Sequence, residues 1–342
     1  MTPPPSDRPA PVSGPARPRV LVTGGAGYVG SHACKALARA GFLPVTLDSL
    51  VTGWAEAVRF GPLIRADLRD RAALDAAFAE HRPVAVLHFA ALSQVAESMA
   101  DPGRYWDNNV TGSLTLLQAM AAAGCGRIVF SSTCATYGES DAVLTEDSPQ
   151  RPVNAYGATK RAVEEMLGHF EAAHGIRHVI FRYFNVAGAD PEGEIGECHR
   201  PETHLIPVMF EALDGQRDAL VIHGTDWPTP DGTCLRDYIH VSDLVAAHLL
   251  GLERLQAGAE SRVYNLGTGQ GWSVRQVLDA VQAVTDKPVP HGFGPRRAGD
   301  VARLVAGADR AAGELGWRPE RAALEVMIAD ALAWHRTGGY RG

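Results

Sequence analysis

Short apolar runs alternate with longer Ala- and Leu-rich stretches from residue 19 onward. Six runs have the length and composition of buried strands: 20–22, 44–47, 63–66, 84–89, 127–131 and 179–183. The stretches between them predict helices at 29–40, 71–80, 105–123 and 155–174. Continuous apolar strands separated by helices indicate a parallel sheet covered on both faces. The right-handed crossover rule then predicts an α/β fold with a doubly wound, Rossmann-like sheet.

After about residue 185 the pattern loosens into turn-rich polar segments. Helices are predicted there at 204–213, 242–255, 274–284 and 321–335, with strands at 220–222 and 262–266. We therefore expect a larger domain of residues 19–185 plus about 234–267, and a smaller α/β lobe of about 186–233 plus 268–342. The cleft between them is the expected ligand site.

Composition narrows the class of protein. Residues 1–18 hold seven of the 22 prolines and predict a disordered or extended tail. The chain as a whole has an ordinary globular composition and a net charge of −7, which argues against nucleic-acid binding. No apolar run reaches the roughly 20 residues of a membrane span, and no secretion signal is evident. Five widely spaced cysteines favour reduced thiols and a cytoplasmic protein: Cys34, Cys125, Cys134, Cys198 and Cys234.

A glycine turn follows the first strand and opens a helix. Gly24, Gly27 and Gly30 permit a tight turn and close approach of the backbone to a pyrophosphate. Alone, such a triplet is also found in ordinary strand-to-helix turns. Asp48 ends the next strand, 18 residues beyond Gly30, where a carboxylate accepts hydrogen bonds from ribose hydroxyls. Since no Arg follows Asp48 directly, the pattern favours NAD over NADP.

Two further strand ends fit a cofactor. Asp67 and Leu68 follow the third strand and could reach the adenine, although Asp67 could also cap the next helix. Phe89 and the small residues Ala90 and Ala91 end the fourth strand, where a chain passes closely under a cofactor.

Tyr156 and Lys160 begin the predicted helix 155–174 and share one of its faces. A free phenol has a pKa near 10, and a neighbouring ammonium together with a cationic nicotinamide favours the phenolate. Lys160 can also bind the nicotinamide ribose. Ser131, Ser132 and Thr133 end the fifth strand, and we favour Thr133 as the hydroxyl that positions a substrate alcohol. The alternatives are a solvated helix face and ordinary turn hydroxyls.

Together with these motifs, several stretches resemble the extended short-chain dehydrogenase/reductase superfamily, and within it the UDP-glucose 4-epimerases. They are 24–32, 89–91, 97–98, 107–110, 130–138, 182–185 and 225–241, of which the last is the most specific. The resemblance covers nearly the whole chain from residue 19. It implies transient oxidation of a UDP-hexose at C4 with tightly held NAD, an NAD-binding larger domain, a nucleotide-sugar-binding smaller lobe and a homodimer.

The resemblance also implies site residues. It makes Tyr156, Lys160 and Thr133 catalytic. The NAD-site residues are Gly24, Gly27, Tyr28, Val29, Gly30, Asp48, Ser49, Asp67, Leu68, Phe89, Ala90, Ala91, Ser93, Asn108, Lys160 and Phe184. The UDP-sugar contacts are Thr133, Tyr156, Asn185, His204, Leu205, Val221, His223, Arg236, Tyr238, Arg297 and Asp300. Arg236 and Arg297 suit a bidentate pyrophosphate clamp, with a surface ion pair as the alternative.

Three positions depart from part of the family. Ser93 stands where some members have Lys, His204 where some have Asn, and Leu304 where some have a Tyr that closes the sugar pocket. The smaller Leu304 leads us to expect room for an N-acetyl group.

Several other functions could use some of the same residues. A 4,6-dehydratase is disfavoured because Cys134 and Ala135 replace its Asp-Glu pair. UDP-N-acetylglucosamine and UDP-xylose/UDP-arabinose epimerases use the same residues and stay open. A non-catalytic NAD-binding protein is disfavoured because the Tyr, Lys and Thr are present. A metal site at Cys198, His199 and His204 is disfavoured because no fourth ligand stands at zinc-site spacing, so no metal is expected.

Overall fold

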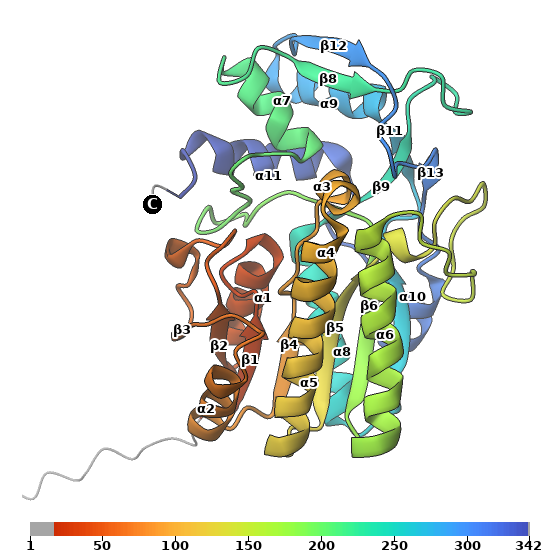
Figure 1. The fold of residues 1–342 in the computed structure, drawn as a ribbon. Helices are drawn as coiled ribbons and strands as arrows, with labels where there is room; N and C mark the ends of the chain where they lie inside the picture. Colours follow the sequence, from red (N-terminus) through yellow and green to blue (C-terminus); the bar gives the residue numbers. More distant parts are fainter. Residues whose placement is uncertain (1–16, 341–342) are drawn as a thin grey trace, which may run out of the picture.

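A seven-stranded parallel sheet forms the larger part of this computed structural model, which describes residues 17–340 (Figure 1). Its strands are β1 (Arg19–Thr23), β2 (Leu43–Asp48), β3 (Leu63–Arg65), β4 (Ala85–His88), β5 (Arg127–Thr133), β6 (Arg177–Tyr183) and β10 (Arg262–Leu266). They lie in the order β10-β6-β5-β4-β1-β2-β3. The strand order reverses beside β1, which is the switch point where ligands bind in such folds.

Helices cover both faces of this sheet. α1 (Tyr28–Arg39) and α8 (Val241–Gln256) pack on one face, and α10 (Asp309–Leu315) contacts α8 and β10. On the other face lie α2 (Arg71–His81), α5 (Gly112–Ala123) and α6 (Ala155–His174), which stand in front in Figure 1. The doubly wound parallel sheet predicted from the sequence is confirmed.

The predicted helix 105–123 is built from different helical types. α3 (Val95–Ala100) precedes α4 (Pro102–Tyr105), and a π-helical segment (Trp106–Thr111) joins α4 to α5. This wider winding belongs to the segment that carries Asn108 and the buried Asn109. π-Helical segments are often found at functional sites.

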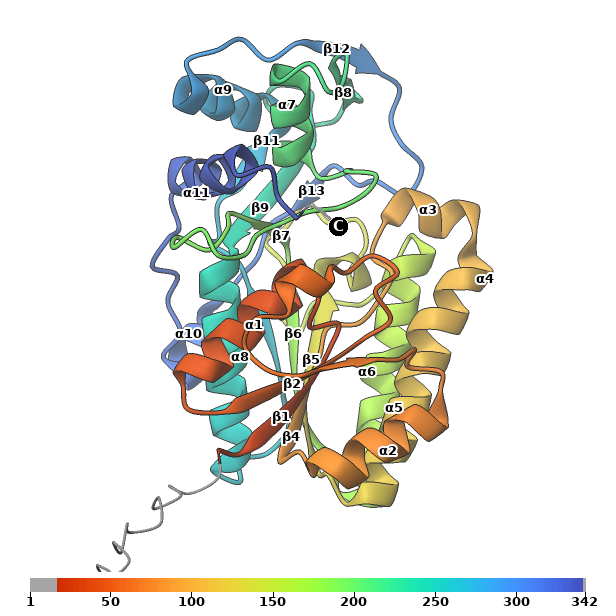
Figure 2. The same ribbon diagram turned by 90° about the vertical axis from the view of Figure 1, so that its left-hand side faces the viewer.

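The smaller lobe lies beyond the carboxyl ends of the strands (Figure 2). Its core is formed by α7 (Leu205–Leu213), α9 (Val274–Thr285) and α11 (Leu324–Arg336), together with β8 (Leu220–His223). β8 pairs with β12 (His291–Gly294), while β9 (Leu235–His240) pairs with β7 (Asn185–Ala187), β11 (Gly271–Ser273) and β13 (Arg303–Leu304). The strand prediction missed β7, β9, β11, β12 and β13 because they are short or carry polar residues.

Strand β10 belongs to the large sheet and α8 packs against that sheet, whereas β9 belongs to the four-stranded sheet. The proposed domain boundaries stay a prediction. The predicted tail lies outside the described residues as far as residue 16. All five cysteines are free thiols. Within residues 17–340, no helix is both long enough and apolar enough to span a membrane.

A buried ion pair ties α6 to β6. Arg182 Nη2 lies 2.6 Å from a carboxylate oxygen of Glu164, and both side chains are buried. Gln150 and Ser132 also donate to this carboxylate. Removing one member of such a pair leaves a desolvated charge without its counter-charge.

We predict that Arg182→Met lowers the free energy of unfolding by about 3 to 5 kcal/mol, because it leaves the Glu164 carboxylate without its cation. Urea unfolding followed by circular dichroism measures this. Arg71→Met is the matched control, since Arg71 pairs with Asp75 one helical turn away and both are largely exposed. That variant should lose no more than about 0.5 kcal/mol. Equal losses in the two variants would contradict the prediction.

Candidate active site

A single cavity of about 880 Å³ lies at the carboxyl ends of the parallel strands. Its wall combines the turns after β1, β2, β4 and β5 with residues of α7, β8 and β9. Every residue assigned above to the cofactor or the substrate lies on this wall. The fold thus brings together positions that are up to 276 residues apart, from Gly24 to Asp300.

The glycine turn allows two backbone segments to touch. Gly24 has φ of +75°, and a Cβ there would lie 2.6 Å from the backbone nitrogen of Ala90. A Cβ on Gly30 would lie 2.1 Å from the carbonyl oxygen of Gly24. Gly27 is the N-cap of α1, whose first turn holds no acidic residue. The positive end of α1 therefore faces a narrow turn of glycines and one alanine, which suits a pyrophosphate.

The Asp48 carboxylate is fixed at the end of β2. Its oxygens accept hydrogen bonds from the backbone N–H groups of Ala26 at 3.0 Å and Leu50 at 2.8 Å. Burial raises the pKa of Asp48, and these two hydrogen bonds lower it. The remaining lone pairs can accept ribose hydroxyls. The turn, the helix end and this carboxylate fit NAD.

Asp67 lies on the cavity wall beside Arg69. It accepts hydrogen bonds from the Arg69 backbone N–H at 2.8 Å and from its guanidinium at 2.7 Å. The Arg69 side chain lowers the pKa of Asp67. The cap of α2 is Asp70, which accepts from the backbone N–H of Ala73. The interpretation of Asp67 as a helix cap is therefore wrong.

Tyr156 begins α6 beside the turn that follows β5. The Asn154 side chain caps this helix by accepting the Gly157 N–H at 2.8 Å. A Cβ on Gly157 would lie 2.3 Å from the carbonyl oxygen of Ala135, so glycine lets the two segments pack closely. As a result the Tyr156 phenol, only 9% exposed, lies on the cavity wall and hydrogen-bonds with the side chain of Thr133.

Burial raises the pKa of Tyr156, the nearby Tyr183 raises it further, and the hydrogen bond with Thr133 lowers it. The pKa of Tyr156 is therefore raised overall, whereas a neighbouring ammonium alone would lower it. The Lys160 Nζ instead donates to the Ser131 carbonyl at 2.8 Å and lies 4.8 Å from the centre of the Phe130 ring. Burial lowers the pKa of Lys160 to about 7, against an opposing effect of Glu164.

Only one of the three hydroxyls at the end of β5 reaches the cavity. The Ser131 Oγ lies 2.8 Å from His248 Nε2, and the Ser132 hydroxyl donates to Glu164. Thr133 lies on the cavity wall, where its Oγ1 accepts the Ala135 N–H at 3.1 Å. The structure therefore leaves Thr133 as the hydroxyl available beside Tyr156.

Two arginines and one carboxylate line the side of the cavity near the smaller lobe. Asp300 lies 4.0 Å from the Arg236 guanidinium and 3.3 Å from that of Arg297. Arg236 also donates to the Val301 carbonyl at 2.9 Å, which fixes its direction. Both arginines thus form ion pairs and line the cavity. Tyr238 is buried opposite Asn185 in the β7–β9 pair.

The far end of the cavity is formed by α7 and β8. His204 is the N-cap of α7 and Leu205 its first residue. Val221 is half-exposed on β8, and His223 Nδ1 lies 3.1 Å from the Pro295 carbonyl.

Sequence reasoning missed Asn109 and Tyr183. The Asn109 side chain bonds both backbone groups of Leu92 and the Thr159 hydroxyl, at 2.9 to 3.1 Å. It therefore ties the loop after β4 to α6. Tyr183 lies on the cavity wall near Tyr156. Both belong to stretches that carry the family resemblance, which was the available signal.

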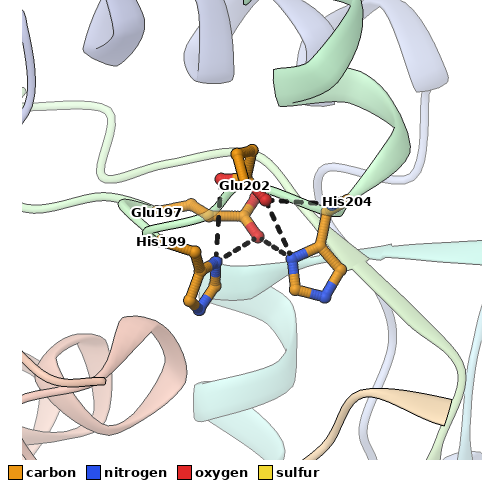
Figure 3. Close-up of side chains that lie close together, drawn as sticks. All are labelled: Glu197, His199, Glu202 and His204. Atoms are coloured by element: carbon orange, nitrogen blue, oxygen red, sulfur yellow. Dashed lines mark hydrogen bonds and ion pairs between the residues drawn. The ribbon is translucent and has the colours of Figure 1, made fainter. Parts of the chain in front are cut away.

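Sequence reasoning considered His199 and His204 but missed the two glutamates that cluster with them at the cavity wall. Glu197 and Glu202 lie against the imidazoles of His199 and His204 (Figure 3). Burial lowers the pKa of each imidazole, but the carboxylates raise it more, to about 9 for His199 and about 10 for His204. The pattern Glu-x-His-x-x-Glu-x-His was visible in the sequence.

Comparison with known proteins shows the family of this chain. Residues 20–267 match the model of the NAD dependent epimerase/dehydratase family. A UDP-glucose 4-epimerase of Rhizobium meliloti (strain 1021) is 50% identical over 317 residues, which are 92% of this chain and 96% of that protein.

Two solved structures are also similar. UDP-glucose 4-epimerase from Brucella ovis in complex with NAD superposes with a TM-score of 0.89 at 44% identity, covering 93% of this chain and 98% of that one. The enzyme from Stenotrophomonas maltophila, with bound NAD and formylated UDP-arabinopyranose, has a TM-score of 0.90 at 40% identity, covering 94% and 99%. The chain therefore belongs to the NAD dependent epimerase/dehydratase family and, within it, to the UDP-glucose 4-epimerases.

Proposed function

We propose that this protein interconverts UDP-glucose and UDP-galactose by inverting the configuration at C4 of the sugar. The observation that carries the proposal is the buried Tyr156 phenol beside Thr133, on the wall of the cavity that also holds the glycine turn and Asp48. The names of the relatives support the choice of substrate. The chain is accordingly an NAD-dependent isomerase.

Bound NAD supplies the hydride acceptor and donor for this reaction, together with the positive charge of its oxidised ring. Gly24, Gly30 and the start of α1 would hold its pyrophosphate, and Asp48 would hold its adenosine ribose. Tyr156 Oη takes the proton from the sugar 4-hydroxyl and returns it to the same oxygen once the 4-keto sugar has turned its other face to the hydride site. Thr133 orients that hydroxyl. Because a phenol is already protonated at neutral pH and burial raises the pKa of Tyr156 further, the chain by itself does not activate this base.

Arg236 and Arg297 hold the pyrophosphate of the UDP-sugar. In the structure described here, Asp300 faces both guanidiniums. An epimerase must present both faces of the sugar to the same hydride site, so its binding energy should be concentrated on the nucleotide. A pair of arginines at one end of the cavity suits that requirement.

Leu304 favours a second substrate. It lies on the cavity wall and packs with Cys134, Tyr137 and Phe184. Because Leu is smaller than the Tyr of some family members, we infer that UDP-N-acetylglucosamine is also accepted. The pentose pair UDP-xylose and UDP-arabinose would use the same residues.

We also infer that the protein acts in the cytoplasm as a homodimer. Helices α4, α5 and α6 lie side by side and form a layer on one face of the sheet (Figure 1). Trp106, in the segment between α4 and α5, is half-exposed. An exposed indole on a helical face suits a second copy of the chain.

We predict that Tyr156→Phe lowers kcat for UDP-galactose epimerisation by at least about a hundredfold, because it removes the group that moves the proton. Retention of NAD should be unchanged. Turnover and bound NAD are measured on the same purified protein.

Tyr183→Phe is the matched control, since Tyr183 is the neighbouring phenol of the cavity. It should keep kcat within about tenfold. Loss of activity in Tyr183→Phe with activity retained in Tyr156→Phe would move the proton transfer to the other phenol.

We predict that Arg297→Gln raises KM for UDP-galactose by about tenfold or more with little change in kcat, because it removes a charge-assisted contact with the nucleotide. Arg296→Gln is the control. Arg296 pairs with Asp226 and stacks on Trp227, so it is engaged outside the cavity. Equal effects on KM in the two variants would reject the clamp.

We predict that the protein epimerises UDP-N-acetylglucosamine at a rate within about tenfold of that for UDP-glucose. Leu304→Tyr should lower kcat/KM for the larger sugar more than for UDP-glucose, because the phenol occupies the space of the acetyl group. Product ratios by liquid chromatography measure both. No turnover of the larger sugar by the wild-type protein would remove this second substrate.

A further inference from the structure

Four potential metal ligands converge at one point of the segment that leads into α7. They are one oxygen each of Glu197 and Glu202 and the Nδ1 atoms of His199 and His204, and all four lie within 4.8 Å of one another. Figure 3 shows the two imidazoles directed at the two carboxylates from the same side. The structure thus keeps His199 and His204 of the set considered from the sequence and joins them to Glu197 and Glu202 in place of Cys198.

The distances within this cluster suit a tetrahedral ion. His204 Nδ1 lies 2.6 Å from Glu197 and 3.4 Å from Glu202. His199 Nδ1 lies 3.3 Å from Glu197 and 3.7 Å from Glu202. With metal–ligand bonds of about 2.0 to 2.2 Å, tetrahedral zinc needs its ligand atoms about 3.3 to 3.5 Å apart. His204 and His199 face different oxygens of Glu202, at 3.4 and 3.7 Å, so that carboxylate must turn slightly to offer one oxygen to the ion, and the 2.6 Å contact must lengthen.

The carboxylates are held ready for such an ion. The side chains of Glu197 and Glu202 are only 8% and 6% exposed. One Glu202 oxygen also accepts the backbone N–H groups of Thr203 and His204 at 2.7 and 2.9 Å, which fixes its orientation. The His199 Nδ1 is buried and has no hydrogen-bond partner of good geometry.

The backbone that carries the ligands is fixed by three distant side chains. The Trp334 indole donates to the Glu197 carbonyl at 2.8 Å, and the Trp54 indole donates to the Cys198 carbonyl at 2.7 Å. Arg217 donates to the Glu202 carbonyl at 3.0 Å. Ligands on a backbone held in this way lose little freedom when an ion binds, as a built site requires.

A second acidic cluster provides a contrast. Asp190, Glu192 and Glu194 also converge, but the Lys35 ammonium contacts all three carboxylates and already supplies the positive charge. In the first cluster, by contrast, no lysine or arginine within residues 17–340 forms an ion pair with either carboxylate, and both face imidazoles, which are metal ligands.

We propose that Glu197, His199, Glu202 and His204 form a binding site for a zinc ion. Two imidazoles and two carboxylates are ligands that zinc accepts in a four-coordinate site. The ion would cross-link residues 197–204 and so stiffen the segment between the cofactor side of the cavity and α7. The proposal concerns binding and does not depend on which sugar the enzyme takes.

The test is titration of the purified, NAD-loaded protein with Zn²⁺ alone, after chelator treatment and in competition with a chromophoric chelator. We expect one ion per chain and a rise in Tm of at least about 3 °C at a hundredfold excess over Kd. His199→Gln and Glu202→Gln should each weaken binding by at least about tenfold, since even outer-shell partners contribute that much.

Two controls separate this site from incidental binding. Cys198→Ser removes the thiol next to the cluster, and His169→Gln removes an exposed histidine of α6. Both variants should bind Zn²⁺ like the wild-type protein. If His199→Gln or Glu202→Gln unfolds, crystals of the wild-type protein are grown with Zn²⁺ instead. Anomalous diffraction should then show a zinc peak between the four side chains. Absence of that peak, or binding that is lost with Cys198 or His169 and kept in His199→Gln, overturns the proposal.

Discussion

The close packing of the start of α6 against the turn after β5 is the constraint on which the site depends. Gly157 allows the helix to approach the Ala135 carbonyl, and Asn154 caps it there. This contact brings Tyr156 and Thr133 together at the carboxyl end of the sheet. A larger residue at position 157 would push the helix outward and separate the two hydroxyls.

Burial sets the electrostatic state of the site. It raises the pKa of the Tyr156 phenol and lowers that of Lys160. Both groups are therefore shifted toward their neutral forms, and their charges depend on what binds beside them. In the same region, Glu164 and Arg182 form a fully paired buried ion pair, which keeps its charge and holds α6 on β6. Reactive and structural charges thus lie next to each other but are stabilised differently.

Much of the fold was predictable because buried parallel strands have continuous apolar sequences. Strands such as β9 (Leu-Arg-Asp-Tyr-Ile-His) were not, because their polar residues hide the pattern. At the site, the motif identified a hydroxyl cluster but could not show that Ser131 and Ser132 are engaged elsewhere. Likewise, Asp67 and Asp70 both suit a helix cap by sequence, and only the backbone geometry selects Asp70. The Glu197–His204 cluster depends on how one loop folds back on itself, which local spacing does not determine.

The central claim is that Tyr156 is the group that moves the proton and that bound NAD completes its activation. The ionisation of this phenol tests it most directly, through the tyrosinate absorbance of cofactor-free and NAD⁺-loaded protein across alkaline pH, with Tyr156→Phe as reference. One tyrosine should titrate at lower pH in the NAD⁺-loaded protein than in the cofactor-free protein, and this low-pH titration should be absent from Tyr156→Phe. An unchanged titration on loading, or a low-pH step that persists in the variant, would contradict it.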